Sequence, residues 1–214
     1  WYHVVATYDG GDDPHDDAKL YINGEEASHV SQTSGSYEFM KNQSITAMIG
    51  RRGLSGAYGD VSCVTEVSVW NSELTQTEIN ELYNDGKALD ATTHSRAISA
   101  STNLKGYWRN NGLATWTDLS EDYSNNGTVT TVTETMLITA GADATRDSQG
   151  FLMNRQRATN SLNTNEEAYT SVAINHTFGT ADFSYGFWFK LEDTENGYLV
   201  GVQSMGNSTG VGLI

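Results

Sequence analysis

Short apolar stretches separated by polar turns run along the chain, and this pattern predicts a mostly β protein built from many short strands. Residues 1–8 (WYHVVATY) carry apolar side chains on both faces, so we expect this strand to lie inside a sheet. The Asn23-Gly24 pair favours a tight turn that joins residues 19–22 to a returning strand at residues 25–30.

Two further segments alternate clearly between apolar and polar positions. In residues 61–70, the alternation predicts one core-facing side made of Val61, Cys63, Thr65, Val67 and Val69. The strongest strand signal is at residues 183–191, where one face consists of Phe183, Tyr185, Phe187, Phe189 and Leu191. Additional strands are predicted at residues 104–109, 128–132 and 168–173.

One short helix is predicted after the strand at residues 61–70. Thr75 and Glu78 have the spacing of a capping box, which marks the start of a helix. Gly86 is expected to provide the left-handed residue that ends it. The predicted buried stripe consists of Ile79, Leu82 and Tyr83.

Composition excludes several classes of partner. The chain of 214 residues has 12 Lys and Arg against 27 Asp and Glu, a net charge of −15, which repels phosphate backbones and argues against nucleic acid. No apolar run approaches the roughly 20 residues that a membrane span needs, so no membrane insertion is expected. Cys63 is the single cysteine, and we expect it to be a small buried side chain. Because the sequence starts at Trp1 within a strand pattern, we expect a segment of a longer polypeptide.

Several runs of residues resemble one known domain type. The runs WYHVVATYDG, KLYINGEE, VTEVSVWNSELTQTEINELYNDG, LKGYWRNN and DLSEDYSNNGTV resemble the later two-thirds of a concanavalin A-like jelly-roll domain of the laminin G-like and pentraxin-like group. Residues 160–203, which include DFSYGFWFKLED, resemble the opening strands of the same domain. The resemblance implies an all-β fold, an antiparallel jelly-roll β-sandwich with one short helix. Thr65 stands where the family usually has a second acid before the valine.

The two resembling parts occur in reverse order. Residues 1–133 correspond to the C-terminal two-thirds of a jelly-roll domain, residues 134–154 are a predicted linker, and residues 155–214 correspond to an N-terminal part. The chain therefore either spans the junction of two tandem copies or completes one sandwich by circular permutation. A tandem-repeat origin is favoured, and the permuted closure is the solution available to the piece alone, because a half-sandwich exposes unpaired edges.

An acidic loop near the start of the chain is a candidate calcium site. Ca²⁺ prefers six to eight oxygen ligands in flexible geometry. The carboxylates that would supply them are Asp9, Asp12, Asp13, Asp16 and Asp17. The spacing is not that of an EF-hand, and the alternative is a solvated loop that keeps the chain soluble. A second acidic stretch, from Asp118 to Asn126, resembles a hydrogen-bonded turn of the family.

Binding is favoured over catalysis. Jelly-roll glucanases carry a Glu-x-Asp-x-x-Glu strand, which is missing here, and the histidines are scattered, so no enzyme is predicted. Sandwiches of this type bind sugars through aromatic faces and polar side chains. The candidate ligand-binding residues are Tyr37, Arg51, Arg52, Tyr58, Trp116 and Tyr123. The alternatives are a plug at the end of the sandwich for Trp116 and a plain surface pair for the two arginines.

The sequence thus predicts a non-catalytic recognition or adhesion module of a multidomain surface or virion protein, on a phage or a bacterial cell. Its expected partner is a glycan or a protein surface, and its expected location is extracellular or on a virion surface. The alternative function is a purely structural virion element, such as a capsid decoration or fibre, that contacts neighbouring subunits.

Overall fold

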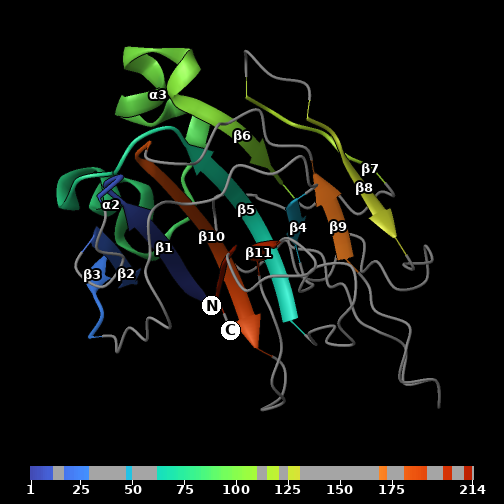
Figure 1. The fold of residues 1–214 in the computed structure, drawn as a ribbon, viewed down its shortest axis with the longest axis horizontal. Helices are drawn as coiled ribbons and strands as arrows, with labels where there is room; N and C mark the ends of the chain where they lie inside the picture. Colours follow the sequence, from blue (N-terminus) through green and yellow to red (C-terminus); the bar gives the residue numbers. More distant parts are fainter. Residues whose placement is uncertain are drawn as a thin grey trace.

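Two antiparallel sheets of six strands each form the protein in the computed structural model (Figure 1). The structure describes residues 1–11, 17–28, 47–49, 62–109, 115–120, 125–130, 169–172, 181–191, 200–203 and 210–213. In spatial order, sheet A consists of β3 (Glu25–Glu26), β2 (Ala18–Ile22), β1 (Tyr2–Tyr8), β10 (Phe183–Leu191), β5 (Ser62–Trp70) and β6 (Leu104–Trp108). Sheet B consists of β12 (Gly210–Leu213), β11 (Val200–Gln203), β4 (Ala47–Ile49), β9 (Tyr169–Val172), β8 (Gly127–Thr130) and β7 (Thr115–Trp116).

Sheet A is buried on both faces. Its inner face packs on sheet B in one core cluster, to which sheet A gives Phe187 and Trp108 and sheet B gives Ile49. Its outer face is covered by α2 (Gln76–Tyr83), η2 (Ala91–Thr93) and α3 (Ser95–Ser99), in a cluster that includes Trp70 and Tyr107. Each such large apolar side chain contributes roughly 1.5–3 kcal/mol when fully buried. The all-β sandwich predicted from the sequence is therefore confirmed.

The strand predictions hold in sheet A. Strand β1 lies between β2 and β10, as its two apolar faces predicted. Asn23 and Gly24 have φ values of 54° and 84°, the left-handed pair that a two-residue turn requires. Strand β10 comes from the second of the two resembling parts, yet it runs between β1 and β5 (Figure 1). The predicted linker at residues 134–154 and both of its boundaries lie outside the described residues.

The predicted helix is confirmed, with a different end. Thr75 accepts a hydrogen bond from the backbone N–H of Glu78, whose side chain accepts one from the backbone N–H of Thr75. The left-handed residue that stops α2 is Asn84, with φ 49°, and Gly86 follows in the turn η1 (Asn84–Gly86). Asn tolerates this conformation because its short side chain can bond locally. The five-residue helix α3 was not predicted.

A β-bulge in β5 corrects the predicted alternation. The register against β10 shifts between Gly186 and Trp188, and Glu66 within this bulge has φ 55°. Thr65 lies opposite Trp188, which packs on Ala88 outside the inter-sheet core, so its predicted core-facing position is wrong. The residues of β5 in the inter-sheet core are Val64, Val67 and Val69. One extra residue in a strand flips every side chain beyond it to the other face. Val61 and the side chain of Cys63 lie outside the described residues.

Within the described residues, no helix has both the length and the apolar character that crossing a membrane requires.

Candidate functional site

A buried carboxylate occupies the bulge of β5. Glu66 is 5% exposed, and its oxygens meet the side chains of Tyr107 in the neighbouring strand β6 and of Arg109, just after the end of β6. The Tyr107 hydroxyl donates to Oε2, and Nε of Arg109 donates to Oε1 and Oε2 at 2.8 and 3.1 Å. Nη1 of Arg109 also lies 3.7 Å from Oδ2 of Asp90, at the start of η2. We call these four residues the Glu66 cluster.

Opposing effects determine the charge of the Glu66 cluster. Burial raises the pKa of Glu66 to about 7, although Arg109 and the Tyr107 hydroxyl act in the other direction. Burial also raises the pKa of Tyr107, so its hydroxyl remains a donor. Burial disfavours the charge of Arg109, but Glu66, Tyr107 and Asp90 together outweigh this and raise the pKa of Arg109. Glu66 therefore titrates near neutral pH beside a guanidinium that stays charged.

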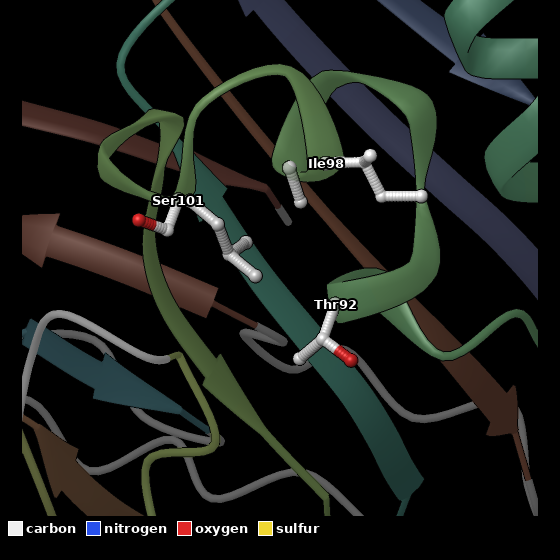
Figure 2. Close-up of a pocket in the computed structure, with 5 residues that line it drawn as sticks. Thr92, Ile98 and Ser101 are labelled. Atoms are coloured by element: carbon white, nitrogen blue, oxygen red, sulfur yellow. The ribbon is translucent and has the colours of Figure 1, made fainter.

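The cluster is connected to a surface hollow on the helix-covered side of sheet A. Asp90 caps η2, because its Oδ1 accepts from the backbone N–H and the hydroxyl of Thr92 at 3.0 and 2.7 Å. Thr92 in turn lines a hollow of about 340 Å³ between η2, α3, η3 (Ser101–Asn103) and β6 (Figure 2). The residues that line it are Thr92, Ala97, Ile98, Ser101 and Leu104. Ile98 at its rim is 72% exposed, so an apolar side chain faces solvent there.

Two buried histidines, His94 and His3, contribute to the fold through a helix cap and through ring packing. His94 caps α3: its Nδ1 accepts from the backbone N–H of Arg96 at 3.1 Å, so Nε2 carries the proton and donates to the carbonyl of Glu78 at 2.9 Å. His3 packs beside the rings of Tyr83 and Trp188, with ring centroids 5.9 and 5.1 Å away. Burial lowers the pKa of His3 to about 3, so the ring is neutral in the folded protein.

The predicted sugar-binding residues meet different outcomes. Trp116 is fully buried in the inter-sheet core, so its ring faces are not available for a sugar. The remaining candidates lie outside the described residues: Tyr37, Arg51, Arg52, Tyr58 and Tyr123.

The predicted calcium ligands are described only in part. Asp9 is exposed, and its Oδ1 accepts from the backbone N–H of Gly11 at 3.0 Å, while Asp17 is half-buried. Asp12, Asp13 and Asp16 lie outside the described residues. In the part of the chain that the structure describes, no three His, Cys, Asp or Glu side chains are grouped as a metal site.

The described residues at the two ends of the second acidic stretch are joined by hydrogen bonds to Asp118, as expected for the predicted turn, and residues 121–124 lie outside the described residues. Oδ1 of Asp118 accepts from the backbone N–H groups of Tyr107 and Ser120 at 3.0 Å and from the Ser120 hydroxyl at 2.7 Å. Its Oδ2 accepts from the backbone and side-chain N–H groups of Asn125, both at 3.1 Å. Asp118 therefore joins Ser120 and Asn125 to Tyr107 in β6.

Sequence reasoning missed the Glu66 cluster. Tyr107 and Arg109 are two residues apart and so share one face of the chain, and Glu66 is the one charged residue in the predicted strand at residues 61–70. A charged residue within a strand buried on both faces needs a partner. This signal could have suggested a buried ion pair, although the choice of strand partner could not be read from the sequence.

The matching family is one of lectins and glucanases. Residues 1–80 match the family model Laminin_G_3, described as the concanavalin A-like lectin/glucanases superfamily. No curated protein and no solved structure is a significant match to the chain. The laminin G-like match confirms the resemblance to a concanavalin A-like jelly-roll domain over residues 1–80. It contains Glu66 and the capping box at Thr75, and it ends before Tyr107 and Arg109.

Proposed function

We propose that the protein is a non-catalytic recognition or adhesion module of a multidomain surface or virion protein, located extracellularly or on a virion, which binds a glycan or a protein surface. The observation that carries this proposal is the laminin G-like match of residues 1–80, on a sandwich whose buried carboxylates are held by the fold. The competing function within this superfamily is that of an enzyme that hydrolyses glycans.

The state of the carboxylates supports binding over catalysis. Glycoside hydrolysis in most families requires two carboxyl groups that flank the bond to be cleaved, one of which donates a proton. Among the described residues, Glu66 and Asp118 are the buried acids. Both oxygens of Asp118 accept hydrogen bonds, from Ser120 and Asn125, and both oxygens of Glu66 accept hydrogen bonds, from Tyr107 and Arg109. Neither group is left to act on a substrate.

Two surfaces are the proposed contact regions. The first is the set of loop side chains predicted from the sequence: Tyr37, Arg51, Arg52, Tyr58 and Tyr123. The second is the hollow beside α3, where the exposed Ile98 offers an apolar contact and Ser101 a hydroxyl (Figure 2). Such a combination suits the apolar face and the hydroxyl edge of a sugar ring.

A glycan array with the whole chain tests the proposal, once with millimolar Ca²⁺ and once with a chelator. We expect binding to a small set of glycans that is lost in Tyr58→Ala if the loops bind, or in Ile98→Asp if the hollow binds. Ser99→Asp, an exposed neighbour of Ile98 outside the hollow, is the matched control. Hydrolysis of a bound glycan would contradict the non-catalytic assignment.

A purely structural virion element is the second candidate, and strand pairing at an open edge would be its simplest contact. Strand β6 forms one edge of sheet A, and there the backbone N–H of Leu119 donates to the Tyr107 carbonyl at 2.8 Å. This contact occupies part of the edge and argues against strand pairing at β6. No glycan binding under either calcium condition, together with stable docking on purified particles, would favour this candidate.

A further inference from the structure

The gap that β10 fills in sheet A is a binding site for a strand. Strand β10 pairs with β1 from Tyr2 opposite Phe189 to Tyr8 opposite Phe183, and on its other side it pairs with β5. It therefore separates two groups of strands, β3-β2-β1 and β5-β6, that belong to the first part of the chain. We call the space between β1 and β5 the β10 slot.

Side chains on both faces of β10 anchor it in the slot. Phe187 is fully buried in the core between the sheets. On the other face, the Trp188 ring lies 5.1 Å from His3 and 6.0 Å from Tyr83. Ser184 adds a polar anchor, because its Oγ accepts from the backbone N–H of Leu74 at 2.9 Å and donates to the carbonyl of Ser72 at 2.8 Å.

These anchors lie far from β10 along the sequence. His3, Ser72, Leu74 and Tyr83 all precede residue 130. Val4 and Val67, which lie in the same core cluster as Phe187, do so as well. Recognition of β10 therefore depends on the slot and on the strand, and not on the connection between them. An empty slot would expose apolar side chains and two unpaired rows of backbone groups, which is a template for pairing with another chain.

The length of chain between β8 and β9 allows the slot to be filled by β10 of the same chain or by β10 of another copy. Strands β8 and β9 are neighbours in sheet B, but residues 131–168 separate them in the sequence. A stretch of that length can reach on the order of 100 Å when fully extended, so chain length alone does not dictate which copy receives β9 to β12.

We propose that the β10 slot also accepts β10 from a second copy of this chain, so that the protein assembles by exchange of strands between copies. The partner is identical in sequence, and the register and anchors are those of the strand seen in the slot. Exchange of an identical element is a route to dimers that needs no new interface. This inference concerns assembly and does not depend on whether the proposed module binds a glycan.

Complementation between two damaged full-length chains tests the proposal. Phe187→Asp damages the strand and leaves the slot intact, whereas Val67→Asp damages the slot and leaves the strand intact. We expect each variant alone to lack a cooperative melt, and a mixture refolded together to regain one in a species with the mass of a dimer. Two differently tagged Phe187→Asp chains are the matched control, because neither can supply an intact strand. A mixture that stays unfolded overturns the proposal.

If the variants aggregate before they can be mixed, a refolding experiment with the wild-type chain tests the same proposal. Tagged and untagged wild-type protein are unfolded in urea and refolded together at increasing concentration, and the products are weighed by light scattering. We expect mixed dimers that persist on dilution, because an exchanged strand leaves only when the sheet opens. Monomers at every concentration overturn the proposal.

Discussion

Glu66 combines a left-handed backbone with a buried carboxylate, and each feature costs stability. A residue other than Gly at φ 55° is strained by about 1–2 kcal/mol, because its Cβ approaches the following carbonyl. Burial of the carboxylate adds a cost that its partners must offset. Tyr107 and Arg109 do so with three hydrogen bonds to the two oxygens. The fold thus maintains a strained residue through contacts made by its side chain.

At the residue scale, we predict that Glu66→Ala destabilises the protein by about 2–4 kcal/mol, because it leaves the Tyr107 hydroxyl without its acceptor and opens a cavity. Glu66→Gln retains an acceptor of the same shape and should cost about half as much. Urea unfolding at pH 7 measures both. Equal losses for the two variants would mean that the charge, and not the hydrogen bonds, maintains the cluster.

Local elements are the part of the fold that the sequence predicted best. The capping box at Thr75 and the Asn23-Gly24 turn each involve residues within four positions, so their signals are complete in the sequence. The bulge at Glu66 was not predicted, because it depends on the register against β10, more than 100 residues away. The burial of Trp116, a predicted ligand-binding residue, was missed for a related reason: β7 has two residues, too few for alternation to indicate a face.

At the element scale, Thr75→Ala should destabilise the protein by about 1 kcal/mol, because α2 loses the side-chain acceptor for the N–H of Glu78. Thr77→Ala is the matched control. Thr77 is exposed inside the same helix, and alanine there should be neutral or slightly stabilising. Thermal melts of both variants measure the difference. An equal effect at the two positions would show that the cap contributes nothing specific.

The loop between β1 and β2 has its own test. If the five aspartates bind Ca²⁺, millimolar Ca²⁺ should raise the melting temperature by several degrees, because a ligand of the folded state stabilises it by mass action. The double variant Asp12→Asn with Asp13→Asn should abolish the rise, and an equal concentration of Mg²⁺ is the control. If Ca²⁺ leaves the melting temperature unchanged, the loop is not a calcium site, and its aspartates serve only as a solvated acidic loop.

For the whole molecule, two buried groups shape the dependence of stability on pH. Between pH 3 and 6.5 the unfolded chain binds a proton on His3 that the folded protein excludes, so stability rises with pH. Between pH 4.5 and 7 the folded protein retains a proton on Glu66 that the unfolded chain has released, so stability falls with pH. The two slopes, each about 1.4 kcal/mol per pH unit, oppose each other from pH 4.5 to 6.5.

We therefore predict opposite slopes in two variants. His3→Phe should lose stability steadily as pH rises from 4.5 to 7, because the Glu66 effect then acts alone. Glu66→Gln should gain stability as pH rises from 3 to 6.5, because the opposing effect of Glu66 is then removed and the His3 effect remains. Urea unfolding at intervals of one pH unit measures both curves. Parallel curves for the two variants would exclude these groups as the cause.

The order in which the strands are synthesised has a consequence for the living cell. A ribosome makes β1, β2, β5 and β6 long before Phe183–Leu191 leaves its exit tunnel. At about 5–20 residues per second, β1 waits on the order of ten seconds for its neighbour. During that delay the nascent polypeptide presents Val5 and Val67 without their final cover. Chaperone supply and slow induction should therefore govern the soluble yield of this protein.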